Sequence, residues 1–306
     1  MQEPSLQFLD VGVPAARTGA PRRMAYWDWP CATGRTSHVV ICVHGLARQG
    51  RDFDILARTL SERARVIAVD VAGRGRSDWL ADPMGYQVPT YAADLAALLM
   101  TLRSVDRELV VDWVGTSMGG LIGMALASQP ALAIRRLVLN DVGPVIQWEA
   151  LQRIGSYLGQ NPSFESEQAA IDYLVSISAT FGPHTAEQWR ALSVPMLRER
   201  DGRWWLHYDP SLALPLKALV DLPDQTQAHQ MVRDGETALW AIYDAITAQT
   251  LLLRGQQSDL LTEATAREMA RRGPMARCVA FEGVGHAPTL VAPDQVATVR
   301  SFLWAE

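Results

Sequence analysis

Apolar residues along this chain fall into short continuous runs, which alternate with longer stretches where they recur every three or four positions. The short runs are rich in Val, Ile and Leu and predict strands at residues 38–43, 65–70, 109–114, 136–140, 250–254 and 276–281. The longer stretches predict helices at residues 52–62, 90–103, 118–128, 262–272 and 293–304. Several strands are apolar on both faces, which is typical of parallel strands covered by helices. The pattern therefore predicts an α/β fold with a mostly parallel sheet.

Two segments depart from this alternation. Residues 5–29 contain SLQFLDVG and RMAYWDW, which we expect to form an antiparallel hairpin on the sheet edge. Between Pro144 and about Ile246 we find no convincing strand. This interval has helical patterns and one irregular aromatic patch; the helices are expected at residues 146–158, 166–180 and 185–198, and the patch at 202–210.

The strand pattern resumes at Thr250, so the interval reads as an insertion into one domain. We expect residues 1–143 and 248–306 to form the core domain, and residues 144–247 to form a helical cap or lid subdomain.

Composition narrows the class of protein. The chain is 48% hydrophobic and 20% charged, as in ordinary globular proteins, and its net charge is −5. Its arginines are scattered, so we expect no nucleic-acid partner. No apolar run has the length of a membrane span, and residues 1–10 show no secretory signal pattern. Three cysteines are too few and too widely spaced for a disulfide framework. We therefore expect a cytoplasmic protein without membrane attachment; oligomeric state stays open.

One serine lies where a predicted strand gives way to a predicted helix. Gly115-Thr116-Ser117-Met118-Gly119 has the pattern G-x-S-x-G, and its position between strand and helix is the context that this pattern requires. Glycine is expected two positions before and after Ser117 because side chains there would collide with the neighbouring strand and helix. We expect Ser117 to be a nucleophile on a turn strained by about 1–3 kcal/mol.

A serine hydroxyl needs a base, and the base needs a carboxylate. His286 is the best-placed histidine, because it follows the last predicted strand on the glycine-rich loop GVGHAP. Asp259 follows the strand at 250–254 and is the preferred acid, since the order Ser, Asp, His is the expected one. Asp141 also follows a strand and is the competing choice.

The oxyanion of an acyl-transfer intermediate needs two N–H donors. Met118 N–H, at the start of the helix after Ser117, is one candidate. Leu46 N–H, on the loop after the strand at 38–43, is the other. We expect His44 to brace this loop and to border the substrate pocket.

Motifs for metals and nucleotides are incomplete. Gly45 and Gly50 have the spacing of a phosphate loop, but Arg51-Asp52 replaces its Lys-Ser/Thr. We find no H-E-x-x-H motif and no Cys/His cluster, so we expect neither metal nor cofactor.

These motifs together resemble those of the α/β-hydrolase superfamily, in its serine hydrolase branch. They are VHG at 43–45, DVAGRGRSD at 70–78, GTSMG at 115–119, the Asp259 loop and GVGHAP at 283–288. The resemblance implies an eight-stranded, mostly parallel sheet with helices on both faces and an inserted helical cap. It implies Ser117, Asp259 and His286 as the catalytic triad, and Leu46 and Met118 as oxyanion donors. In this family the segment at 70–78 shapes a loop beside the active site.

The resemblance also implies a small-molecule ester as substrate. The inserted region looks like that of small carboxylesterases and of intracellular hydrolases of hydroxyalkanoate oligomers. Lactone hydrolysis and carbon–carbon bond hydrolysis use the same residues and stay open, as does a ligand receptor that keeps the fold.

Half of the ten tryptophans fall in the inserted region, which suggests an apolar acyl pocket. We expect Trp204, Trp205 and His207 to line this pocket together with His44.

Overall fold

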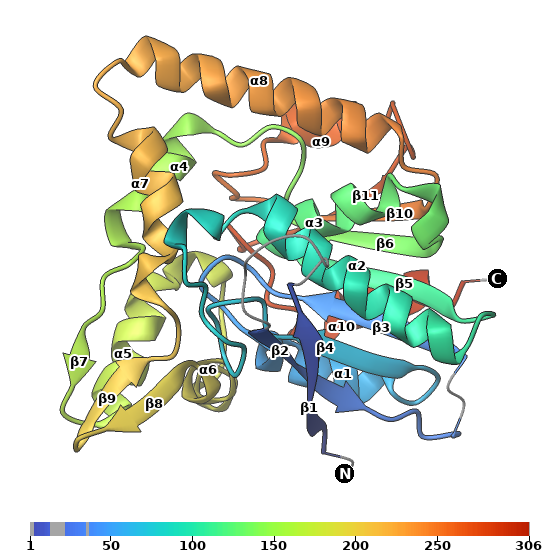
Figure 1. Cartoon of the computed structure of the whole chain (residues 1–306), viewed down its shortest axis with the longest axis horizontal. Helices are drawn as coiled ribbons and strands as arrows, with labels where there is room; N and C mark the ends of the chain where they lie inside the picture. Colours follow the sequence, from blue (N-terminus) through green and yellow to red (C-terminus); the bar gives the residue numbers. More distant parts are fainter. Residues whose placement is uncertain (1–2, 13–21, 35–36, 306) are drawn as a thin grey trace.

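A sheet of eight strands forms the centre of the molecule, counted over residues 3–12, 22–34 and 37–305, which a computed structural model describes (Figure 1). The strand order is β1-β2-β4-β3-β5-β6-β10-β11. An antiparallel pair at one edge consists of β1 (Ser5–Val11) and β2 (Arg22–Trp29), and β2 pairs antiparallel with β4. The parallel strands are β3 (His38–Val43), β4 (Arg65–Val69), β5 (Val110–Thr116), β6 (Ile134–Asn140), β10 (Gln249–Gly255) and β11 (Arg277–Phe281).

All six strands expected from apolar runs are confirmed, as are the α/β class and the mostly parallel sheet. The edge hairpin is confirmed too, although its connection, residues 13–21, lies outside the described residues.

Helices cover both faces of the sheet because its central strands are apolar on both sides. Along β3, Val39 and Ile41 belong to one core cluster, whereas Val40 and Cys42 belong to the other. The first cluster includes side chains of α2 (Val88–Val105), α3 (Met118–Ala127) and α9 (Glu263–Met269). The second includes side chains of α1 (Asp54–Leu60) and α10 (Pro293–Leu303).

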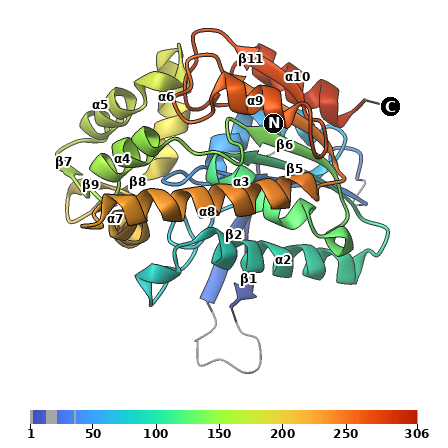
Figure 2. The ribbon, with the colours of Figure 1, turned by 90° about the horizontal axis from the view of Figure 1, so that it is seen from above.

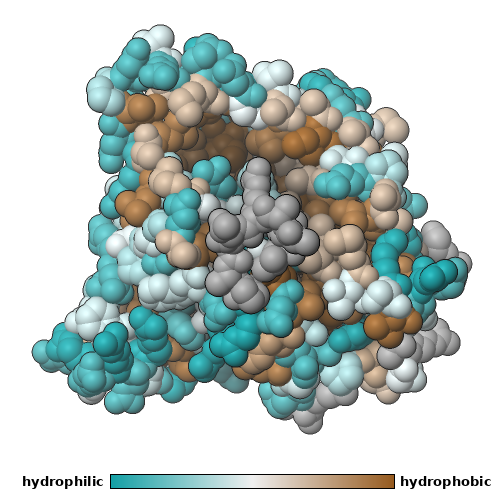
Figure 3. Space-filling view, viewed as in Figure 1, coloured by the Kyte–Doolittle hydropathy of each residue, from teal (hydrophilic) through white to brown (hydrophobic). Residues whose placement is uncertain are grey.

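Between β6 and β10 the chain leaves the sheet. It forms α4 (Trp148–Tyr157), α5 (Glu167–Ile177), α6 (Ala186–Ser193), α7 (Ala213–Val220) and α8 (Gln225–Asp244). In the view of Figure 1, α4 to α7 gather on the left of the sheet and α8 returns along the top. Figure 2 shows α8 crossing over α3, which also packs against α2. The space-filling view shows apolar surface around a hollow beneath α8 (Figure 3).

The expectation that this interval lacks strands is wrong. It contains a small antiparallel sheet, β7 (Ser163–Phe164), β9 (Arg203–Leu206) and β8 (Leu197–Arg200), in the order β7-β9-β8. A turn at Asp201 and Gly202, with φ of 54° and 69°, joins β8 to β9. Strands of two to four residues are too short to show a period of two in sequence. The aromatic patch predicted as irregular therefore contains β9.

Candidate active site

Ser117 lies at the tip of the turn between β5 and α3, with φ 51° and ψ −116°. Its amide donates to Asn140 O at 2.9 Å, which fixes the turn against the end of β6. A Cβ on Gly115 would lie 2.2 Å from Gly119 O, and a Cβ on Gly119 would lie 2.0 Å from Val43 O. Both glycines are therefore needed for backbone clearance, in the way the sequence pattern indicated.

Three side chains from three strand ends form a continuous hydrogen-bonded relay. His286 Nε2 lies 3.0 Å from Ser117 Oγ, and His286 Nδ1 lies 2.7 Å from Asp141 Oδ2. Asp141 is 0% exposed and follows β6 directly. Its Oδ1 accepts from Gly255 N–H at 2.8 Å, and its Oδ2 also accepts from Ser258 Oγ at 2.6 Å. These contacts hold the Asp141 carboxyl group rigidly as a hydrogen-bond acceptor facing the imidazole.

The preferred acid from the sequence, Asp259, does not reach His286, so that expectation is corrected. Asp259 instead accepts two hydrogen bonds from Arg153, at 2.6 and 3.0 Å, and its side chain is 45% exposed. Ser258, one residue earlier, is the residue of this loop that faces the relay. The competing choice, Asp141, occupies the position beside His286.

The strand order explains this outcome. β6 lies between β5, which carries Ser117, and β10, so a residue at the end of β6 is flanked by both strands. Asp141 continues directly from the strand, whereas Asp259 comes four residues after Gly255, on the outside of a turn. Sequence alone gives both aspartates the same context, a position after a strand.

The inserted region holds the histidine loop in place. Thr180 Oγ1 donates to His286 O at 2.9 Å, and Gly285 N–H donates to Thr180 O at 2.7 Å. The side chain of His286 is 14% exposed, so it retains contact with the cavity beside it.

His44 is fully buried and orients the loop after β3. Its Nδ1 donates to Gly45 O at 2.7 Å, and its Nε2 accepts from Val71 N–H at 3.0 Å, which fixes the neutral tautomer. In a planar trans peptide the C=O and N–H point in opposite directions. Holding Gly45 O therefore directs Leu46 N–H away from His44, and Leu46 lines the same cavity as Ser117.

Burial is the main cause that lowers the pKa of His44, to about 3. The folded protein then keeps His44 neutral, whereas the unfolded chain binds a proton near pH 6.5. Stability contributed by neutral His44 is present above about pH 6.5 and is lost as the pH falls toward 3.

Replacing His44 by glutamine is expected to flatten the acid side of the stability profile. Between pH 7 and 5, the unfolding free energy of the wild-type protein should fall by about 2 kcal/mol more than that of His44→Gln. The reason is that His44 takes up a proton in the unfolded wild-type chain, whereas the variant has no imidazole at this position. Urea unfolding at both pH values measures the difference. Equal losses in the two proteins would contradict the assignment of a buried neutral His44.

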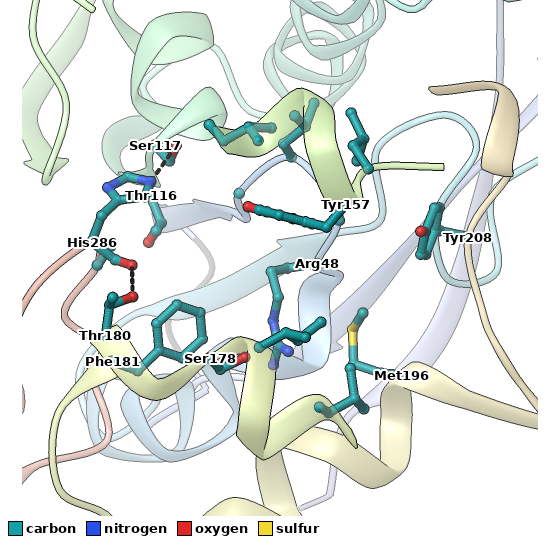
Figure 4. A pocket seen from close by; sticks show the side chains of 18 of the residues that line it. Arg48, Thr116, Ser117, Tyr157, Ser178, Thr180, Phe181, Met196, Tyr208 and His286 are labelled. Carbon is teal, nitrogen blue, oxygen red and sulfur yellow. Dashed lines mark hydrogen bonds between the residues drawn. The ribbon is translucent and has the colours of Figure 1, made fainter. Parts of the chain in front are cut away.

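A mainly apolar, partly open cavity lies between the end of the sheet and the inserted region. Figure 4 shows Ser117 and His286 at one end and Met196 and Tyr208 at the other, with Tyr157 and Arg48 between them. Its further lining includes Leu46, Arg153, Ile154, Leu158, Tyr173, Leu174, Ile177, Phe181 and Leu206. The inserted region supplies most of this wall.

The four residues predicted to line the pocket do not line this cavity. Along β9 and the residues after it, Leu206 and Tyr208 face the cavity, and Trp205 and His207 alternate with them. Trp204 packs partly buried against the main core, and His44 lies behind the oxyanion loop. For Trp205 and His207 the prediction found the right segment but the wrong face, because face depends on the pairing of β9.

Sequence reasoning missed the arginines of this cavity. Arg48 donates from Nε and Nη2 to Asp52, both at 2.7 Å, and Arg153 is paired with Asp259. The i, i+4 spacing of Arg48 and Asp52 was the available signal. For Arg153 there was none, since its partner lies 106 positions away.

The sequence profile of the alpha/beta hydrolase fold matches residues 38–293. The chain belongs to this family. A crystal structure of an alpha/beta hydrolase from Novosphingobium aromaticivorans is 33% identical, with a TM-score of 0.80 and 99% of each chain covered. The resemblance found in the sequence is therefore confirmed.

Relatives of this alpha/beta hydrolase are named as hydrolases and as an esterase. The 3-hydroxybutyrate-oligomer hydrolase of Cupriavidus necator is 45% identical over 303 residues, covering 98% of this chain and 97% of the relative. Esterase Rv0045c of Mycobacterium tuberculosis is 27% identical, covering 83% and 78%. The 2-(acetamidomethylene)succinate hydrolase of Mesorhizobium japonicum is 26% identical, covering 84% of each. This alpha/beta hydrolase is an enzyme that acts on ester bonds.

Candidate metal-binding clusters and membrane-spanning helices are both absent from the described residues. Within ranges 3–12, 22–34 and 37–305, no three His, Cys, Asp or Glu side chains are grouped to hold a metal ion. Among the same residues, no helix combines the length and apolarity required to cross a membrane.

Proposed function

We propose that the enzyme hydrolyses short esters of hydroxy acids, in particular 3-hydroxybutyrate oligomers, through an acyl-enzyme on Ser117. The observation that carries this proposal is the relay from Ser117 through His286 to Asp141, which opens on a mainly apolar cavity. The 45% identical relative, a 3-hydroxybutyrate-oligomer hydrolase, supports the choice of substrate.

The proposed reaction has two halves. Ser117 Oγ attacks the ester carbonyl while His286 Nε2 takes the hydroxyl proton, and the negative charge moves to the carbonyl oxygen. His286 then gives the proton to the leaving alcohol as the C–O bond breaks. Water attacks the acyl-serine in the same way, which releases the acid and restores Ser117. Asp141 stabilises the imidazolium through its contact with Nδ1.

The oxyanion is proposed to rest on the amides of Leu46 and Met118. Met118 begins α3, where the first N–H groups have no partner within the helix and the helix dipole favours negative charge. Leu46 N–H is directed by the bond from His44 to Gly45 O.

Charge in the cavity favours an uncharged ester chain. Both arginines that line it are paired with carboxylates, Arg48 with Asp52 and Arg153 with Asp259. Neither adds an uncompensated positive charge, so the cavity suits the neutral repeat of a polyester better than a dicarboxylate.

We further propose that residues 144–247 act as a cap over the core formed by 1–143 and 248–306. The cap supplies Tyr157, Phe181 and Tyr208 to the cavity wall, and through Thr180 it braces His286. We also propose a cytoplasmic location, where the free thiols of Cys31, Cys42 and Cys278 stay reduced.

A substrate panel tests the proposed function. The linear dimer and trimer of 3-hydroxybutyrate are compared with p-nitrophenyl butyrate, a butyrolactone and a vinylogous diketone, with released acids quantified by chromatography. We expect the oligomers to be cleaved with kcat/KM of about 10⁴ M⁻¹ s⁻¹ or more, because enzymes typically reach that range on their own substrates.

The other results identify the alternatives. Cleavage of the diketone without ester turnover would establish a carbon–carbon bond hydrolase, and turnover of the lactone alone a lactonase. Binding without turnover of any compound would establish a receptor.

A further inference from the structure

A fully buried arginine lies next to the proposed oxyanion hole. Arg74 belongs to the turn after β4 and is 0% exposed. No carboxylate of the described residues lies within ion-pairing distance of it. A guanidinium stays protonated in proteins, so an unpaired one in the interior is costly unless its donors are used.

The donors of Arg74 contact both residues that carry the proposed oxyanion amides. Nε donates to Leu46 O at 2.8 Å, and Nη2 lies 3.5 Å from Met118 Sδ. Nη1 donates to Ala72 O at 2.6 Å, which ties the group to its own turn. One rigid planar group therefore joins the loop after β3 to the first residue of α3.

Aromatic rings, and not carboxylates, flank the charge. The guanidinium carbon lies 4.8 Å from the ring centroid of Tyr91 and 5.7 Å from that of Tyr86. Tyr86 OH donates to Asp209, whose charge acts on Arg74 without a direct ion pair. The guanidinium thus contacts aromatic rings and the residues that carry the oxyanion amides, and no carboxylate of the described residues pairs with it directly.

The same turn is where the cap docks on the core. Gly75 N–H donates to His207 O, and Asp209 N–H donates to Gly73 O, at 3.2 and 2.8 Å. Arg74 pairs with Tyr208 in an isolated β-bridge, and Tyr208 lines the cavity. Arg74 therefore sits where the cavity wall, the oxyanion loop and the nucleophile turn meet.

We propose that Arg74 is a positioning residue for the oxyanion hole, and that its charge favours the oxyanion formed on the substrate. This inference rests on the proposed acyl transfer at Ser117. The ester is neutral in the ground state and negative only in the transition state and the intermediate. A fixed, desolvated cation that contacts both residues carrying the donors therefore acts on kcat and leaves substrate binding nearly unchanged.

The test compares Arg74→Met, Arg74→Gln and Arg74→Lys on p-nitrophenyl butyrate. We expect kcat to fall about 10- to 100-fold in the Met and Gln variants while KM stays within about threefold, a smaller loss than that of a direct oxyanion donor. Arg74→Lys keeps the charge and should recover part of the lost kcat. Affinity for a boronic acid that mimics the tetrahedral intermediate should fall in parallel with kcat/KM.

Arg136→Met is the matched control. Arg136 is also buried, donates to the backbone carbonyls of Leu303 and Ala305 and lies over the ring of Phe302, but at the start of β6, away from Ser117. Its replacement should leave kcat within about twofold. Urea unfolding shows which variants are folded. If Arg74→Met is not folded, Arg74→Gln is used to test the role of Arg74.

Two results would overturn the role of Arg74. One is unchanged kcat and boronate affinity in a folded neutral variant, and the other is a loss confined to KM. Turnover that persists in Ser117→Ala would instead refute the proposed acyl-enzyme on Ser117. The substrate panel tests the hydroxybutyrate assignment separately.

Discussion

A Ser117→Ala variant is expected to lose about 10⁶-fold in kcat on any ester that the wild-type enzyme turns over. Alanine keeps the turn between β5 and α3 but removes the only atom that can form the acyl-enzyme with His286 as its base. KM should change little, because the cavity that binds the ester is intact. Steady-state assays with stoichiometric protein measure the residual rate.

The control for this variant is Ser128→Ala. Ser128 directly follows α3 as its C-cap and donates from Oγ to Ala125 O, so the change affects one helix end and no group of the cavity. A fluorophosphonate probe should label wild type and Ser128→Ala at one serine and leave Ser117→Ala unlabelled. Labelling of Ser117→Ala with retained turnover would remove Ser117 from the mechanism.

Asp141→Asn is expected to lower kcat about 10⁴-fold, whereas Asp259→Asn changes it by no more than about threefold. Asparagine at 141 has the shape of aspartate, but its amide NH₂ offers protons where His286 Nδ1–H needs an acceptor. The histidine then loses both its orientation and the charge that stabilises its protonated form. Asp259 is half-exposed and bound to Arg153, so its charge has no such role.

The two asparagine variants form a matched pair because both aspartates follow strands of the same sheet edge. Single-turnover rates on p-nitrophenyl butyrate separate acylation from deacylation, and both should slow in Asp141→Asn. Thermal unfolding checks that the fold survives, since Asp141 also accepts from Gly255 N–H and Ser258 Oγ. If Asp259→Asn shows the larger loss of kcat, the assignment of Asp141 fails.

Local features of this site could be predicted from the sequence. The turn at Ser117 is set by glycines within two residues, and its position between an apolar strand and a helix follows from hydropathy alone. His286 was found because a glycine-rich loop after the last strand must reach the carboxyl edge of a parallel sheet. The structure brings these two side chains to 3.0 Å of each other.

Contacts that depend on the order of strands in the sheet were harder to predict from the sequence. The sequence offered Asp141 and Asp259 in equivalent contexts, and only the placement of β6 between β5 and β10 puts one of them beside His286. The same holds for Arg74, whose partners Leu46 and Met118 lie 28 and 44 positions away.

By itself, then, the sequence determined the α/β class, the parallel strands, the turn that presents Ser117 and the loop that carries His286. These depend on periodicity and backbone sterics over a few residues. Tertiary structure decided which aspartate meets His286 and which face of β9 lines the cavity. Those outcomes depend on strand order and pairing register between distant segments, and a shift of one residue exchanges Leu206 for Trp205 at the cavity wall.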